Sequence, residues 1–213
     1  ISSHLTLLTG IAGINVYIVR ILKLPFDISL HFYFFFFVGV IITGILKMFF
    51  YSSVGAGFLG TLGSSALLYV SIHWIILGNT INIPLLYIQG LLLGFGASMT
   101  LVSGSMATLL DGDLKEAAQR SQTMHTIRNF SAAMLIPIIA YTIKNHIQKG
   151  TQSIYAENIT DKMIYLKKLQ DVAIDADHQI FLLMIIFNMV MFVSSIIQMI
   201  LGKGRRITPP RES

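Results

Sequence analysis

The feature that most constrains this chain is a stretch of 63 consecutive residues, 48–110, that contains no Asp, Glu, Lys or Arg. A soluble domain carries about 25% charged residues, because its surface must be solvated. This chain of 213 residues carries 12% and is 54% hydrophobic. Since one helical crossing of a bilayer needs about 20 apolar residues, the stretch predicts two or three membrane spans and excludes a soluble globular fold.

Six apolar segments of near-spanning length occur along the chain. In lipid each must be helical, because only a helix satisfies its own backbone polar groups there. The predicted spans are about 5–22, 29–50, 52–77, 84–110, 123–143 and 179–201. Short breaks with turn residues separate most of them, so consecutive helices should be antiparallel neighbours. The predicted fold class is all-α integral membrane, with six transmembrane helices.

One connection, over 144–178, is long and hydrophilic. Within it, apolar residues recur every three positions from Met163 to Val172. This spacing fits either a short amphipathic helix at the interface or a solvated loop with a helical turn. A basic tail over 204–213 follows the last span and predicts a cytoplasmic C-terminus, which would make the connection extracytoplasmic.

No Asp or Glu falls inside any of the predicted spans. Ionisable side chains within a membrane are functional candidates, so the sequence does not predict a carboxylate proton relay here. The net charge of +5 comes from Lys and Arg that flank apolar segments, which does not favour nucleic-acid binding. The chain has no cysteine and no recognised catalytic motif. We therefore expect no enzyme activity, no cofactor and no metal site.

Residues 55–60, GAGFLG, match the dinucleotide-binding pattern G-x-G-x-x-G. That fingerprint requires a preceding strand and an acidic residue about 20 positions later, whereas the next acid here is Asp111. Within membrane helices, small residues instead let two helices approach closely. The glycines assigned to helix packing are Gly55, Gly57, Gly60, Gly63, Gly90 and Gly94.

Arg128 lies about five residues into the fifth predicted span, between His125 and Asn129. Its guanidinium either reaches back to the membrane interface or faces inward toward a partner helix or an anionic group. Pro137 should kink the same helix, because it removes a backbone hydrogen bond. Other polar side chains within the spans, such as Asn15, either join helices or contact a ligand.

Two segments carry a resemblance to a known family. Residues 91–143, LLLGFGASMTLVSGSMATLLDGDLKEAAQRSQTMHTIRNFSAAMLIPIIAYTI, combine a glycine-rich helix, a short charged loop, and a helix that opens with small residues and an arginine. Residues 39–60, GVIITGILKMFFYSSVGAGFLG, look like a degenerate copy of a loop between two helices in that family. Together they resemble the C-terminal half of a major facilitator superfamily transporter, in its 14-span multidrug proton-antiporter branch.

The resemblance implies two inverted three-helix repeats, about 1–77 and 82–201. The first, second, fourth and fifth helices would line a central cavity facing an N-terminal lobe, which would hold most proton-carrying acids. The implied function is proton-coupled export of amphipathic organic compounds by alternating access across a cell membrane, namely a bacterial inner membrane. The implied substrate-binding or coupling residues are Asn15, Tyr17, His31, Gln89, Thr100, His125, Arg128 and Asn129. The alternative is a six-helix subunit with a structural or channel role in a larger complex.

Overall fold

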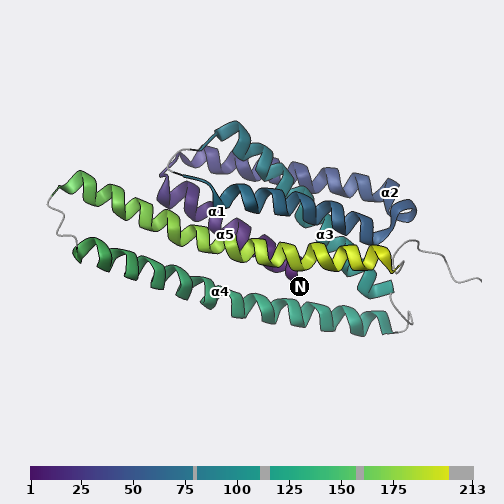
Figure 1. Cartoon of the computed structure of the whole chain (residues 1–213). Coiled ribbons are helices and arrows are strands. Elements are labelled where there is room, and N and C mark those ends of the chain that lie inside the picture. The colour runs from purple at the N-terminus through teal and green to yellow at the C-terminus, as the bar shows by residue number, and fades with distance from the viewer. Residues whose placement is uncertain (79–80, 111–115, 157–160, 202–213) are drawn as a thin grey trace, which may run out of the picture.

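The computed structural model describes residues 1–78, 81–110, 116–156 and 161–201, and every regular element within these ranges is helical. The elements are α1 (Ser2–Asn15), η1 (Val16–Ile21), α2 (Phe26–Ile75), α3 (Ile83–Leu110), α4 (Ala117–Ala156) and α5 (Lys162–Ile200) (Figure 1). η1 is a π-helical continuation of α1. The predicted all-helical fold is confirmed for these residues.

Six helical segments in the described part of the chain are long and apolar enough to cross a membrane. They are Ser2–Ile21, Phe26–Phe50, Ser53–Ile75, Ile83–Thr108, Ala117–Tyr155 and Lys162–Ile200. Six such segments indicate a multi-pass membrane protein, as the sequence predicts.

α2 consists of two limbs that meet at Gly55. This residue has φ 80° and ψ 168°, a conformation outside the helical region that glycine adopts most easily. The limbs correspond to Phe26–Phe50 and Ser53–Ile75. From its sequence context, Gly55 is predicted to lie in a helix-packing face. The structure instead places it at the break where the chain reverses direction.

The first limb of α2 packs closely along α3 in the same direction. The backbone of Phe32 lies against Gly90, and one turn later the backbone of Phe36 lies against Gly94. A Cβ atom at Gly94 would overlap the carbonyl oxygen of Phe36. We call this contact, together with Gly39 of the first limb against α3, the glycine seam. The small residues allow the two backbones to touch.

The second limb of α2 packs in the opposite direction and joins α5 to α3. Gly57 lies against the backbone of Met199, and Gly60 lies near the side chain of Ser195. Gly63 turns toward α3 instead, where its added Cβ would lie 2.6 Å from that of Met99. These glycines therefore occupy close contacts between helices, which is the environment expected for small residues in membrane proteins.

Several buried hydroxyl groups within the helices donate hydrogen bonds to backbone carbonyl oxygens. Ser64, Ser71 and Ser103 each donate to the carbonyl oxygen four residues earlier, at 2.6 to 2.8 Å. Thr43 also reaches the carbonyl oxygen of Phe95 across the glycine seam. Since an unsatisfied polar group in an apolar interior is costly, this arrangement lets polar residues occupy buried positions.

α4 and α5 are much longer than the sequence predicts. The region 144–178, predicted as a hydrophilic connection with either a loop or a short interfacial helix, instead continues α4 to Ala156 and begins α5 at Lys162. Asp161 caps α5 by accepting a hydrogen bond from the backbone of Met163 at 2.8 Å. Helices of 39 and 40 residues are about 60 Å long, so their joined ends form a hairpin that extends past the other helices (Figure 1).

Two predicted segments lie wholly or partly outside the described residues. They are the turn over 111–113 that should end the fourth span and the basic tail over 204–213. α4 itself begins at Ala117 and runs through Pro137, so the fifth span starts earlier than predicted.

Candidate functional site

Arg128 lies on the side of α4 that faces the rest of the bundle. Its Nη2 atom donates to Ser105 Oγ on α3 at 3.2 Å and lies 3.7 Å from the sulfur of Met124. Its Nε atom is buried without a hydrogen-bond partner. Among the described residues Arg128 makes no ion pair. The guanidinium therefore keeps both its charge and one donor free for another group.

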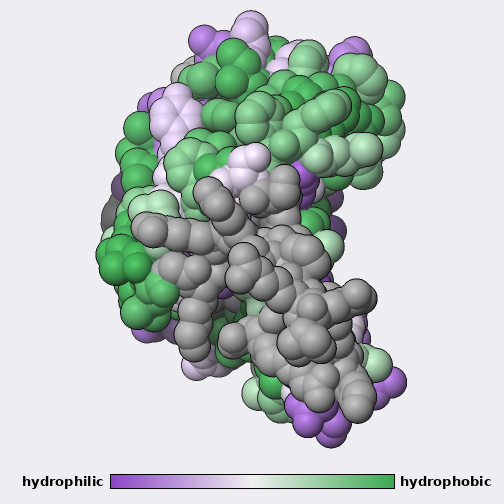
Figure 2. Space-filling view, turned by 90° about the vertical axis from the view of Figure 1, so that its right-hand side faces the viewer, coloured by the Kyte–Doolittle hydropathy of each residue, from purple (hydrophilic) through white to green (hydrophobic). Residues whose placement is uncertain are grey.

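The surroundings of Arg128 come from three helices. Ser105 belongs to α3, and the guanidinium also lies within electrostatic range of His4 on α1. α4 packs mainly along α5 and touches α1 and α3 over a shorter length. Viewed along the helices, apolar side chains cover much of the visible surface of the described residues (Figure 2). Arg128, on α4, and Ser105, on α3, form the polar contact that we call the Arg128 site.

The predicted site residues do not converge on one place. Asn15, His125 and Asn129 have exposed side chains. His31 is also exposed, and its Nδ1 atom lies 2.7 Å from the carbonyl oxygen of Asp27 at the start of α2. These four lie on the outer surface of the chain, whereas Arg128 and Gln89 each keep a buried nitrogen without a hydrogen-bond partner.

Three further predicted residues are buried and already hydrogen bonded. Thr100 lies 2.6 Å from the hydroxyl of Ser3, which ties α3 to α1. Gln89 accepts a hydrogen bond from the indole of Trp74 at 2.8 Å, and its own Nε2 atom is left without a partner. Tyr17 donates to the carbonyl oxygen of Gly78. These contacts join helices, which is one of the two roles expected for polar residues within the spans.

Asn188 makes the most extensive polar contact between helices. Its amide nitrogen donates to the carbonyl oxygen of Leu67 at 3.1 Å and to Ser71 Oγ at 3.0 Å, and its oxygen accepts from Thr6 at 2.9 Å. The side chain is fully buried. One amide therefore connects α1, α2 and α5, as interhelical hydrogen bonds do in other membrane bundles.

Asp177 is a buried acid that the sequence analysis does not find. It lies on α5, is 2% exposed, and both carboxyl oxygens lack a hydrogen-bond partner in the described part of the chain. The sequence places this residue in a hydrophilic connection, next to the predicted start of the last span. The signal that could have found it is the apolar spacing of Ile174, Phe181 and Met184, which continues the last span's buried face back past Asp177.

The surroundings of Asp177 are largely aromatic. The ring of Tyr17 on η1 lies close enough to interact electrostatically with the carboxyl group. One turn along α5, the ring of Phe181 lies 6.5 Å from that of Tyr17 and 5.3 Å from that of Trp74. His178, the next residue, has its Nε2 atom 2.8 Å from the carbonyl oxygen of Leu77. No described residue forms an ion pair with Asp177.

Asp177 and Arg128 therefore form two separate polar sites. Asp177 lies beside the corner at Leu77, at the end of the bundle where the α4 and α5 hairpin begins. Arg128 lies nearer the other end, beside Ser105 in the last turns of α3. The two side chains do not form an ion pair with each other.

Comparison with known proteins gives this chain no relative. No family model matches it, and neither a curated protein nor a solved structure is significantly similar to it.

Proposed function

We propose that this chain is the C-terminal lobe of a secondary transporter that exports amphipathic organic compounds by alternating access, coupled to protons. The single observation that carries this proposal is the guanidinium of Arg128 between α4 and α3, which keeps a buried Nε donor unused. An ionisable side chain among apolar spanning helices is costly, and such residues commonly mark the path of a substrate or ion.

The arrangement of α4 supports a binding role for this side chain. α4 is supported mainly along α5 and touches α1 and α3 over a shorter length. In transporters of this general type, substrates bind near the middle of the membrane between two lobes. In our proposal α4 faces an N-terminal lobe, and Arg128 contacts a negatively charged or strongly polar group of the substrate.

The proposed membrane, orientation and partners follow from the resemblance of residues 39–60 and 91–143 to a major facilitator superfamily transporter. The six spans form two inverted three-helix repeats in the inner membrane of a bacterium, and the C-terminus lies in the cytoplasm. The partners are then the N-terminal lobe, the lipid bilayer, a small-molecule substrate and protons. The close packing of α2 on α3 and the looser attachment of α4 are compatible with a lobe that rocks as a unit while one helix contacts substrate.

Arg128→Ala in the full-length protein tests the proposal. Cells that express each variant are loaded with ethidium, an amphipathic cation, or with a fluorescent bile acid, an amphipathic anion, and energised efflux is measured. We expect the wild type to export at least one probe. We expect Arg128→Ala to reduce that rate about tenfold, which corresponds to about 1.4 kcal/mol of lost interaction.

Phe130→Ala is the matched control, because Phe130 is two residues away on α4 and its ring is exposed. Unchanged efflux by Arg128→Ala at normal expression would reduce Arg128 to an interface anchor. Absence of energised efflux of both probes by the wild type would count against the transporter and favour the six-helix subunit instead.

A further inference from the structure

Asp177 is a buried titratable group that the proposed Arg128 site does not use. Its carboxyl group is 98% shielded from solvent by the protein itself, since its relative exposure is 2%. Neither oxygen has a hydrogen-bond partner in the described ranges. An ionised carboxylate in such a place would lack both water and a counter-charge, and that state costs several kcal/mol.

The groups around Asp177 do not supply the missing charge. On η1 the nearby titratable group is Tyr17, whose hydroxyl hydrogen is directed to the carbonyl oxygen of Gly78. On α5 itself, His178 is engaged with the carbonyl oxygen of Leu77. Asp175 is exposed and carries the same charge sign as Asp177.

The histidines on α2 and α4 do not supply a counter-charge to Asp177 either. His73, near the end of α2, stacks on Tyr69 with ring centroids 5.7 Å apart. On α4, which runs antiparallel to α5, Gly150 packs on Val172, so Lys144 and His146 are the titratable residues nearest in register to Asp177, and the side chain of Lys144 is exposed. None of the described side chains forms an ion pair with Asp177.

A metal ion is a poorer occupant of this place than a proton. No three His, Asp or Glu side chains within the described ranges gather into a possible metal site. A hard cation such as sodium or calcium needs several oxygen ligands, whereas a proton needs only the carboxyl group. Protonation also removes the charge that the surroundings cannot accommodate.

We propose that Asp177 is the proton-binding residue of the transport cycle and that it is protonated in this conformation. The inference rests on the proposed transporter function and names the residue that couples it to protons. The step is the transfer of H⁺ from the carboxylic acid to water, which leaves a carboxylate. It occurs when α5 moves away from η1 and water reaches the carboxyl group.

The local backbone is suited to such a movement. η1 is a π-helical segment that contains Tyr17, with Leu22 donating to the carbonyl oxygen of Tyr17 at 2.9 Å. π-Helical turns within α-helices frequently occur at functional sites. The corner at Leu77 and Gly78 is held to α5 and η1 by two single hydrogen bonds, from His178 and Tyr17. These two bonds must break before the corner can separate from α5 and η1.

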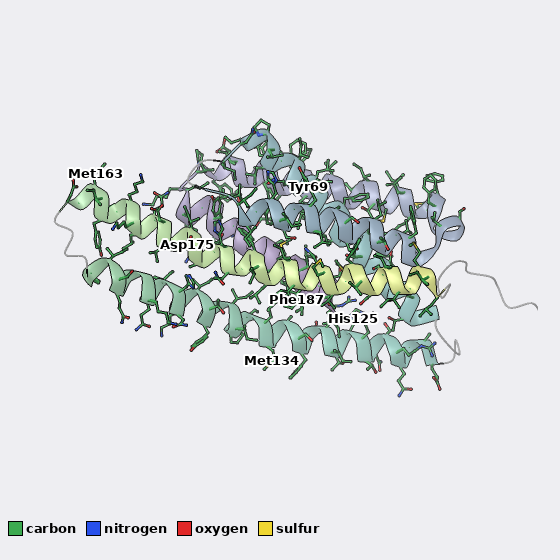
Figure 3. The ribbon with its side chains drawn as sticks, viewed as in Figure 1. Tyr69, His125, Met134, Met163, Asp175 and Phe187 are labelled. Atoms are coloured by element: carbon green, nitrogen blue, oxygen red, sulfur yellow. The ribbon has the colours of Figure 1, made fainter. Side chains whose placement is uncertain are left out.

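The first experiment measures protonation directly by infrared difference spectroscopy on the purified full-length protein. At neutral pH an exposed carboxyl group is ionised, because its ordinary pKa is about 4. We expect the wild type to show the carbonyl stretch of a protonated carboxylic acid, and Asp177→Asn to lose it. Asp175→Asn is the control, since it alters an exposed acid two positions away on the same helix (Figure 3), and it should keep the band.

The second experiment measures coupling in proteoliposomes. A pH gradient should accelerate export of the accepted probe by the wild type and by Asp175→Asn at least tenfold. Asp177→Asn should show less than a twofold effect of the gradient while it still exchanges probe down its own gradient.

The outcomes separate this inference from the proposed function. If the wild type lacks the protonated-acid band, or if Asp177→Asn leaves its intensity unchanged, the inference is overturned even when transport is intact. If part of the band depends on Asp177 but no probe is transported, the proposed function fails while the buried proton remains. Should Asp177→Asn not fold, Asp177→Glu replaces it in both assays, because the longer acid keeps a titratable group and should shift the frequency of the band that belongs to this position.

Discussion

The glycine seam and the attachment of α4 are two helix contacts of opposite character. In the seam, backbone lies on backbone, and Gly39, Gly90 and Gly94 leave no room for a side chain. α4 instead meets its neighbours through side chains, as where Gly150 faces the branched side chain of Val172. Since apolar burial gives little drive for association in lipid, close packing must hold helices together there. The seam is therefore the most closely packed contact of the bundle, and α4 is attached to the bundle less extensively.

The difference in packing between the glycine seam and α4 also explains which polar side chains keep unused hydrogen-bonding groups. Among the tightly packed helices, side-chain amides and hydroxyls such as those of Asn188 and Thr100 form hydrogen bonds between helices. On the loosely packed α4, Arg128 keeps an unused donor. Two deeply buried side chains are exceptions: Gln89 keeps one donor nitrogen unpartnered, and Asp177 has no partner for either carboxyl oxygen in the described part of the chain. Binding a proton makes the Asp177 carboxyl group neutral, and burial favours that neutral form.

Gly94→Ala should have the largest effect on stability and would break the seam. The new Cβ overlaps the carbonyl oxygen of Phe36, and backbone cannot move aside as a side chain can. We expect a loss of about 3 kcal/mol, at the upper end of the range for overpacking, measured as unfolding free energy by titration with sodium dodecyl sulfate. Gly104→Ala is the control on the same helix, where an added Cβ meets nothing within 4 Å. Equal stability of the two variants would mean that the seam is not tight.

Gly150→Ala applies the same change to the contact of α4 with α5, and its effect should be smaller. The added Cβ would lie 2.5 and 2.7 Å from the two methyl groups of Val172, a half-buried side chain, whereas the clash at Gly94 is with backbone. Alanine also favours the helix over glycine by about 1 kcal/mol, which offsets part of the clash. We expect a net change within about 1 kcal/mol in the same titration. A loss as large as that of Gly94→Ala would show that α4 is held as rigidly as α3.

The sequence predicts the number and type of the helices because spanning segments must be long and apolar. It predicts their ends less well where charged residues continue a helix beyond the membrane. Residues 144–156 and 162–178 are helical because α4 and α5 support each other there, as at Gly150 and Val172. That support comes from residues distant in sequence, which hydropathy does not detect.

The same reason accounts for the differences at the candidate sites. Asp177 resembles any charged residue of a polar connection until η1 and α2 cover it. Gly55 resembles the packing glycines that follow it, and only its φ of 80° shows that it forms a reversal. The choice between an inward and an outward Arg128 depended on the rotation of α4, which local spacing did not determine. Its contact with Ser105 now shows the inward direction.

Met134→Ala should have the smallest effect and tests the outer side of α4. Met134 lies on the side of α4 that faces away from the other helices and is 54% exposed (Figure 3). Its truncation should change the unfolding free energy by no more than about 0.5 kcal/mol, whereas Met99→Ala, the same change at a 1% exposed position on α3, should cost about 2 to 5 kcal/mol. A loss above about 1 kcal/mol for Met134→Ala would mean that another protein surface covers this side in the native assembly. α4 would then be held from both sides, and the contrast between α4 and the glycine seam would disappear.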